Sequence, residues 1–417
     1  MKKSFIIAAL LLALTLSACK TSNLKNTTDM MANIKKDNIE TIKLSDLNDP
    51  KVNRRNEIID FSLQIFRDSY DNENILISPL SIISALGMVS NGANGETLSE
   101  LENAFDSDIK GLNEYLKAYA QYLPSSDKYK VSLANSIWFK DKESLTIDND
   151  FLQTNKDYYD ASIYKAPFDE STKNAINAWV NNMTSGMIDK LLEEAPSLDT
   201  VMYLINALSF DAEWETVYKQ IQVTEGEFVS ENGKKQAAKF MNSNEYTFLE
   251  DNSVTGVIKP YKDNKYAFVA LLPKDNISMR ELLDYLNAKN IMSLIENKAS
   301  ETVLTKLPKF SFEYNKMLNE PLKKMGIIDA FDEQKADFLK LGKSLDGNIF
   351  INRVIHKTKI DVNEKGTQAG AVTAVEMDAT GVIIETKEVI LDRPFFYMII
   401  DTEQNLPLFI GSLMDVN

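Results

Sequence analysis

The residue types that most often carry chemistry are scarce in this chain, which has one histidine, His356, and one cysteine, Cys19. These two residues cannot build a His/Cys zinc cluster or an HExxH helix, and the sequence has no GxGxxG, GxxxxGK[ST] or GxSxG motif. His356 could serve a hydrolase as a general base. Its setting in the strand-like residues 349–362 instead favours a hydrogen-bonded core residue. We therefore expect no enzymatic activity, no catalytic residue, no metal and no cofactor.

Cys19 ends a segment with the features of a secretory signal peptide. Residues 1–3 are basic, residues 6–16 are apolar, and small residues precede the cysteine. The apolar run is too short for a membrane span, and a polar stretch follows it. The pattern resembles a bacterial lipobox, so we expect residues 1–18 to be removed and Cys19 to carry lipid, since no second cysteine offers a disulfide. The alternative is an ordinary signal peptide with an incidental cysteine.

The net charge limits the partners of the mature chain. It is −15 for the whole sequence. Removing residues 1–18 takes away two lysines and no acidic residue, which moves the charge to −17. Such an acidic body is not expected to bind nucleic acid or anionic lipid electrostatically. We expect attachment to a bacterial cell envelope, in the outer membrane or at the cell surface, to depend on the lipid.

The stretch from Glu364 to Gly381 can form either a strand or a loop. Read from Thr367 at a period of two, all of its charges fall on one face, as in a half-buried strand. Its glycines and its Ala/Thr-rich composition make that strand weak. From Thr367 to Ala374 it contains no proline, no charge and nothing larger than Gln and Val.

The rest of the chain predicts an α+β fold, with helices concentrated in the first half and strands in the second. A polar tether is expected over residues 19–47, and the folded body over 48–417. Helices are predicted around residues 59–70, 74–88, 176–191 and 315–325, and strands at 133–140, 201–210, 266–272, 302–312 and 349–362. Residues 394–411 predict a closing hairpin that is apolar on both faces. Asn206 interrupts an apolar strand and must be hydrogen-bonded inside the protein.

Several separated motifs occur in an order that resembles the serpin family over residues 50–417. They are Asn74–Ser81, Asn206–Phe210 followed by Trp214-Glu215, Pro260-Tyr261, Leu271–Pro273, Leu307–Phe310, Val362–Thr367 and Asp392–Phe395. The resemblance implies a single domain with three β-sheets, eight or nine helices and an exposed reactive-centre loop at about residues 364–393. It also implies a monomeric protease inhibitor that acts as a suicide substrate: a protease cuts the loop and forms an acyl-enzyme, and the freed loop enters the large sheet.

The same resemblance implies roles for individual residues. Ser78, Ser81, Asn206 and His356 match a polar cluster where the sheet must open. Lys309 and Glu364 match a pair that braces the top of the sheet, with Trp214 beside it. The matching hinge residues are Glu364, Gly366, Thr367, Ala369 and Ala371.

The position of the cut depends on which landmark is used. The family spacing of fourteen residues from the hinge glycine gives Thr380-Gly381, whereas eleven residues back from Pro394 gives Ile383. We favour the first, because the inserted length decides where the protease is delivered, and keep Met377 and Ile383 as alternatives. Small, uncharged residues around Thr380 suit elastase-like or subtilisin-like serine proteases, and papain-like cysteine proteases are a further option.

Two other functions compete with inhibition. One is a non-inhibitory serpin that acts as a binding or carrier protein, whose usual mark, a bulky or charged hinge, is missing here. The other is a hydrolase using His356, which the shortage of partner residues disfavours.

Overall fold

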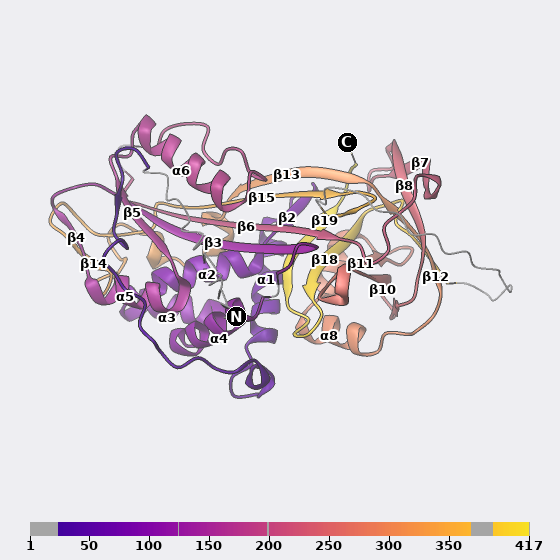
Figure 1. Cartoon of the computed structure of the whole chain (residues 1–417), viewed down its shortest axis with the longest axis horizontal. Coiled ribbons are helices and arrows are strands. Elements are labelled where there is room, and N and C mark those ends of the chain that lie inside the picture. Colours follow the sequence, from indigo (N-terminus) through magenta and orange to yellow (C-terminus); the bar gives the residue numbers. More distant parts are fainter. Residues whose placement is uncertain (1–23, 124, 198–199, 368–386, 417) are drawn as a thin grey trace, which may run out of the picture.

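One large sheet runs along the long axis of the molecule and organises the elements around it (Figure 1). The computed structural model describes residues 24–123, 125–197, 200–367 and 387–416. In spatial order the strands of this sheet are β1 (Thr28–Asp29), β5 (Ser162–Ala166), β3 (Tyr129–Lys140), β6 (Met202–Glu213), β16 (Gly366–Thr367), β15 (Arg353–Val362) and β13 (Phe310–Met317).

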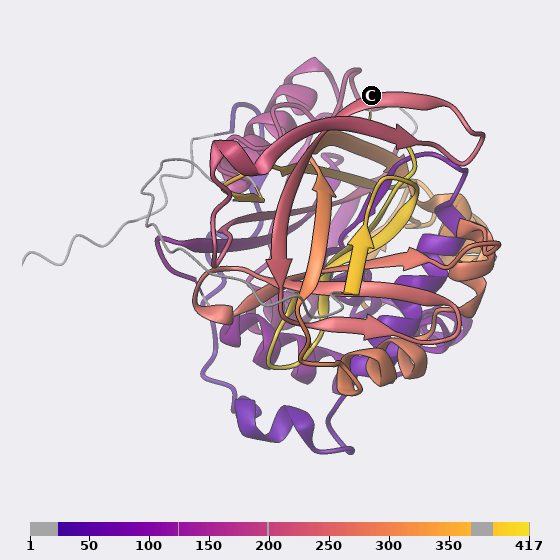
Figure 2. The same cartoon turned by 90° about the vertical axis from the view of Figure 1, so that its right-hand side faces the viewer.

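Two further sheets lie toward the right-hand end of the molecule in Figure 1, and the four-stranded one faces the viewer in Figure 2. The six-stranded sheet has the order β2 (Ile75–Ile77), β19 (Pro407–Leu413), β18 (Phe395–Asp401), β11 (Tyr266–Pro273), β10 (Val254–Pro260) and β9 (Phe248–Glu250). The four-stranded sheet has the order β17 (Lys387–Ile390), β12 (Val303–Pro308), β8 (Lys235–Glu245) and β7 (Val223–Val229). A two-stranded ribbon, β14 (Gly342–Ser344) with β4 (Leu145–Ile147), adds to the three expected sheets.

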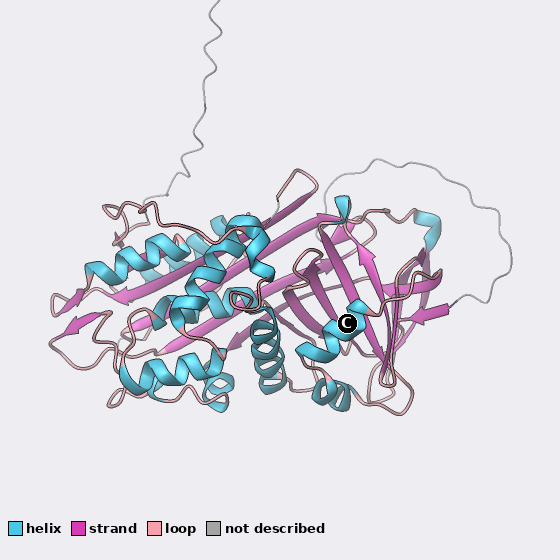
Figure 3. Cartoon of the chain, turned by 90° about the horizontal axis from the view of Figure 1, so that it is seen from below, coloured by secondary structure: helices cyan, strands magenta, loops and turns pink. Residues whose placement is uncertain are grey.

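The described residues form nine α-helices, in agreement with the expected eight or nine. They are α1 (Arg55–Ser69), α2 (Pro79–Ser90), α3 (Gly95–Phe105), α4 (Ile109–Tyr122), α5 (Asn149–Tyr159), α6 (Glu170–Met183), α7 (Met279–Tyr285), α8 (Ala288–Glu296) and α9 (Asn319–Lys324). Helix α6 covers one face of the large sheet, and α2 packs on the other (Figures 1 and 3). None of the helices described here has the length and apolarity needed to cross a membrane.

Helix α2 is buried on all sides, as predicted, but it begins later than expected. Proline lacks a backbone N–H and favours an extended residue before it. Ser78 accordingly has φ −108° and ψ 99°, and the helix begins at Pro79. Residues 75–77, predicted as part of the helix, form strand β2 at the edge of the six-stranded sheet.

The predicted strand at residues 302–312 is two strands that belong to different sheets. Strand β12 ends at Pro308, and β13 begins at Phe310. Lys309 therefore lies at the corner between the sheets, where its amide donates to the Lys239 carbonyl. The predicted helix at 315–325 is also shorter than expected, because residues 315–317 complete β13 and the helix covers only α9. Farther along the α6 stripe, Met187, Ile188 and Leu191 are buried in the connection after that helix.

The segment expected as a tether differs from that expectation from residue 24 onward, because it lies against the body. Strand β1 pairs antiparallel with β5, and the Met30 amide donates to the Ile163 carbonyl at 2.9 Å. The Asp37 amide donates to the Asp157 carboxylate at 2.7 Å. Met31 and Leu47 are buried in the core. These apolar residues are too widely spaced to produce a periodic pattern, so only the polar composition was visible in the sequence.

Candidate functional site

The two residues of β16 lie between β6 and β15 at one end of the large sheet. Gly366 pairs with Glu213, and Thr367 pairs with Ala212 on one side and Val362 on the other. A Cβ atom at Gly366 would overlap the carbonyl oxygen of Ala212, so this close approach requires glycine. Thr367 is buried, and its Oγ1 lies 2.5 Å from the hydroxyl of Tyr261. The start of the hinge is thus already part of the sheet.

Beyond β16, its two neighbouring strands β6 and β15 pair with each other over only part of their length. Strands β6 and β15 pair in parallel from Tyr203 and Arg353 up to Asn206 and His356. Above that point, residues 207–211 and 357–361 are not paired with each other in the described register. On their other sides, these same residues pair with β3 and β13. We call this part of the sheet the seam.

The turn at residues 363–365, which connects β15 to β16, is held by backbone hydrogen bonds from two aromatic residues. The Trp214 amide donates to the Lys365 carbonyl at 2.8 Å, and its indole Nε1 donates to the Asn363 carbonyl at 2.9 Å. The Tyr218 amide donates to the Glu364 carbonyl at 2.9 Å. Trp214 also stacks on Tyr261, with ring centroids 4.4 Å apart. The position of the hinge therefore depends on Trp214 and Tyr218.

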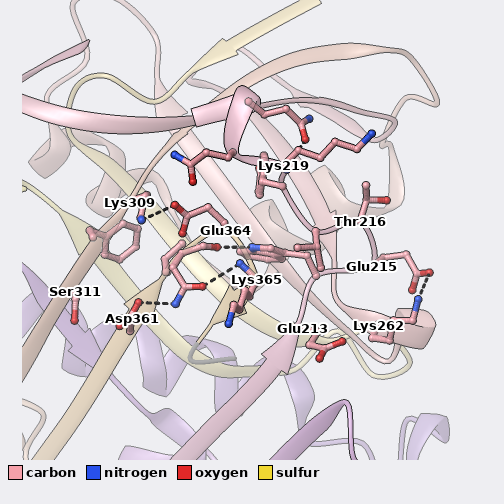
Figure 4. A pocket seen from close by; sticks show the side chains of 18 of the residues that line it. Glu213, Glu215, Thr216, Lys219, Lys262, Lys309, Ser311, Asp361, Glu364 and Lys365 are labelled. Carbon is pink, nitrogen blue, oxygen red and sulfur yellow. Dashed lines mark hydrogen bonds and ion pairs between the residues drawn. The ribbon is translucent and has the colours of Figure 1, made fainter. Parts of the chain in front are cut away.

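Lys309 and Glu364 form an ion pair across the same turn (Figure 4), with Nζ and Oε1 2.6 Å apart. The side chains are 31% and 25% exposed, so the pair is only partly shielded from water. Partial burial would raise the pKa of Glu364. The hydrogen bond from the Lys309 ammonium, a backbone hydrogen bond and the positive charges of Lys309 and Lys239 together outweigh burial and hold the pKa below its ordinary value. The carboxylate is therefore charged at neutral pH and joins the turn to the corner between two sheets.

An open pocket of about 1540 Å³ lies beside the turn (Figure 4). Lys309, Glu364 and Trp214 line it, together with both charged residues of a second ion pair, Lys262 and Glu215, at 3.2 Å. The upper end of the seam is thus reachable from solvent.

The predicted polar cluster is assembled at the lower end of the seam. The Asn206 Oδ1 lies 3.0 Å from the Ser81 hydroxyl and 2.8 Å from the His356 Nδ1. The Ser78 amide donates to the His356 Nε2 at 3.1 Å. Nε2 must therefore be unprotonated, and burial lowers the pKa of His356 to about 3. Ser78 takes part through its backbone, since its hydroxyl has no partner among the described residues.

The structure thus forms three of the predicted groups: the polar cluster at the lower end of the seam, and the Lys309–Glu364 ion pair with Trp214 and the first hinge residues at its upper end. The other predicted site residues lie outside the described residues: Cys19, Ala369, Ala371, Met377, Thr380, Gly381 and Ile383. Sequence reasoning missed Tyr218, which gave no signal because it acts through its amide. It also missed Lys259 and Glu245, buried charges behind Trp214; a lysine in the otherwise uncharged residues 254–260 was the signal available.

Comparison with known proteins places this geometry in context. The family model "Serpin (serine protease inhibitor)" matches residues 56–416. An uncharacterised serpin-like protein of Methanosarcina acetivorans is 30% identical over 358 residues, which cover 82% of this chain and 81% of that protein.

Solved structures agree with the family match. The thermophilic serpin tengpin in its native state superposes with a TM-score of 0.88 at 45% identity, over 94% of this chain and all of that one. The latent state of tengpin superposes less well, with a TM-score of 0.78 at 44% identity over 92% of this chain and all of that one. Thyroxine-binding globulin, solved with thyroxine, shares the fold at 23% identity, with a TM-score of 0.77 over 87% of this chain and 99% of that one.

Proposed function

The chain belongs to the serpin (serine protease inhibitor) family, and from this premise we propose that it is an inhibitory serpin, not an enzyme, that traps its target as an acyl-enzyme. The observation that carries the proposal is the position of β16 above the seam. Two hinge residues already occupy the sheet, and the strand edges below them are not paired with each other. The chain superposes better on native tengpin than on latent tengpin, which supports a native-like state as well.

The register of β16 predicts where the loop would lie after insertion. Thr367 stands opposite Ala212 and Val362, and each further loop residue moves one position down both strands. Six residues on, Thr373 would meet Asn206 and His356, which are themselves a parallel pair. Both neighbouring strands therefore give the same register. The polar cluster would have to part for the strand to pass, and the Thr373 hydroxyl would face it.

The composition of the loop fits this register. The core-facing residues after Thr367 would be Ala369, Ala371, Thr373 and Val375, which are small and uncharged. Glu376 would come opposite Tyr203 and Arg353, and the Arg353 guanidinium already lies over the Tyr203 ring at 5.8 Å. A carboxylate beside that guanidinium is electrostatically favourable. A bulky or charged core-facing residue, which would block insertion, is not present in this stretch of the sequence.

Insertion would supply the free energy for trapping. About a dozen residues gaining ladder hydrogen bonds at about 0.5–1.5 kcal/mol each contribute on the order of 10 kcal/mol. That amount is comparable to the whole stability of a typical domain. It would be enough to distort the active site of an attached protease.

We place the cut at Thr380-Gly381. The protease nucleophile would attack the Thr380 carbonyl, the peptide bond would break, and Gly381 would leave as the new amino terminus. Thr380 lies four residues beyond Glu376, or about 13 Å in extended chain, which would hold the protease just past the end of the sheet. Elastase-like and subtilisin-like proteases are the favoured targets. Met377 and Ile383 remain the alternative sites, and papain-like enzymes the alternative class.

The test is a denaturing gel of the chain after incubation with an elastase, combined with mass spectrometry of the released carboxyl-terminal peptide. An SDS-resistant band with the mass of the protease plus the chain up to Thr380, and a released peptide beginning at Gly381, support the proposal. Clean cleavage without that band would instead support the alternative, a non-inhibitory binding or carrier protein. Thyroxine-binding globulin gives that alternative its precedent, because it shares the fold and was solved with a small ligand.

For location, the lipobox-like residues before Cys19 support a lipid-anchored protein of the bacterial envelope. Metabolic labelling with a fatty-acid analogue tests this, because Cys19→Ser should abolish incorporation while the folded body is unchanged.

A further inference from the structure

A buried ion pair lies directly behind the residues that hold the hinge. Lys259 of β10 donates to Glu245 of β8, with Nζ and Oε1 2.6 Å apart. The side chains are 4% and 8% exposed. Their strands belong to the six-stranded and the four-stranded sheets, so the pair joins two sheets.

The ammonium of Lys259 also faces both residues that hold the turn. It lies 4.4 Å from the centre of the Tyr218 ring and 5.3 Å from that of Trp214, within the range of cation–π attraction. On the other side, Ser243 donates to Glu245 at 2.6 Å and lies 3.1 Å from the Tyr218 hydroxyl. Both charges of the pair are thus connected to the aromatic residues.

General stability does not explain this arrangement. Removing two charges from water is costly, and well-packed apolar residues in the same place are often as stable or more stable. Burial would lower the pKa of Lys259, but Tyr218 and Glu245 beside it outweigh burial and raise the pKa above its ordinary value, so the ammonium stays charged. What a charged pair provides, and apolar packing does not, is a directional hold on its neighbours.

We propose that the buried pair of Lys259 and Glu245 is a positioning device for the hinge. It fixes the side-chain rings of Trp214 and Tyr218. The backbone amides of these two residues hold the turn at residues 363–365, so the pair keeps β16 in the sheet. Lys259 and Glu245 act on the turn through the aromatic residues. The consequence for protease trapping rests on the inhibitory function proposed above, whereas the consequence for the hinge does not.

The experiment replaces both charges together, so that neither remains buried without its partner. In the full-length protein, Lys259→Met/Glu245→Met keeps the apolar stems and removes the pair. The matched control is Tyr119→Phe, which removes a buried 2.8 Å hydrogen bond to Asp401 away from the hinge. Hydrogen exchange by mass spectrometry follows residues 212–218 and 362–367, and denaturant unfolding follows global stability.

We expect exchange in both segments of the double variant to accelerate about thirtyfold, the size that losing one desolvated cation–π contact gives. The free energy of unfolding of the double variant should change little. Tyr119→Phe should lower the free energy of unfolding without accelerating exchange in these two segments. Unchanged exchange at the hinge, or equal acceleration throughout the chain, would overturn the proposal. If the double variant does not fold, Tyr218→Leu serves instead, because it removes a ring and keeps the amide; native-like hinge exchange in that variant would equally overturn it.

The link to trapping has a separate readout. A hinge that leaves the sheet more often should insert later, so the double variant should consume severalfold more inhibitor per elastase molecule trapped. An unchanged ratio despite faster hinge exchange would overturn the link between the pair and insertion. If the unmodified chain traps no elastase, the proposed function fails, while hydrogen exchange still decides whether the pair positions the hinge.

Discussion

Reversing the charge of Glu364 should open the seam and make the protein self-associate. The ion pair with Lys309 is 2.6 Å long but 25–31% exposed, so its loss should cost more than that of a fully exposed pair and less than that of a buried one, about 1–2 kcal/mol. A lysine at position 364 would also repel Lys309, which adds about 1 kcal/mol. The total for Glu364→Lys is then about 2–3 kcal/mol, concentrated on the turn.

The expected consequence is polymerisation on mild heating. If the turn detaches, β16 leaves the sheet, and the edges of residues 207–211 and 357–361 can pair with a strand of another molecule. Size-exclusion chromatography after incubation below the unfolding midpoint measures the monomer fraction. We expect Glu364→Lys to lose monomer faster than the native chain, and Glu364→Gln to show a smaller effect.

The charge-swapped variant Lys309→Glu/Glu364→Lys provides the control, because it restores an opposite-charge pair with the same two residue types. It should recover most of the monomer fraction. A Glu364→Lys variant that stays as monomeric as the native chain would refute the reasoning. So would a swapped variant that polymerises as fast as the single one.

Three further predictions follow from the same geometry. His356→Ala should lower the free energy of unfolding by about 2–4 kcal/mol at pH 7, because the Ser78 amide and Asn206 lose a buried partner. The pKa of His356 falls from 6.5 to about 3 on folding. The contribution of the neutral imidazole to the free energy of unfolding is therefore complete above pH 6.5 and falls by about 1.4 kcal/mol per pH unit as the pH drops toward 3. In denaturant unfolding, the variant should lack this pH dependence. Thr367→Arg should reduce the SDS-resistant elastase complex at least about tenfold while the loop is still cut, because Thr367 must lie buried in the sheet; Thr367→Ser should retain it. Trypsin should cut slowly after Lys387 and form no complex, because that residue is paired in β17 and lies seven positions beyond Thr380.

Each of these has an outcome that would count against it. They are a His356→Ala variant with native stability at pH 7 and the same pH dependence, a Thr367→Arg variant that traps elastase normally, and a stable trypsin complex on a denaturing gel.

Elements with a strong local pattern could be predicted from the sequence. The alternating and continuous apolar runs predicted β6, β11 and the closing hairpin, and burial bears them out. Two of the boundaries that failed lie at prolines: α2 begins at Pro79, and β12 ends at Pro308, where the expected strand divides between two sheets. Both effects are local, but an apolar count over a window of residues does not detect them.

The candidate site was predictable only where a motif matched the family. Asn206 and His356 were expected in one polar cluster, and Lys309 was expected to pair with Glu364; the structure places the residues of both pairs in contact. The partial entry of β16 was not foreseen, because it depends on how closely Gly366 approaches the Ala212 carbonyl across the sheet. Contacts of this kind join residues more than a hundred positions apart, and a single sequence carries no record of them.

The central claim is that the cut loop enters the seam as a new strand. Thermal unfolding of the chain after a protease, used in catalytic amount and then inactivated, has cut it between residues 377 and 384 measures this most directly. A gain on the order of 10 kcal/mol should raise the unfolding midpoint by roughly 10 °C or more over the uncut chain. A cut chain that unfolds at the same temperature as the uncut one, with both fragments still associated, would contradict insertion and the inhibitory function proposed from it.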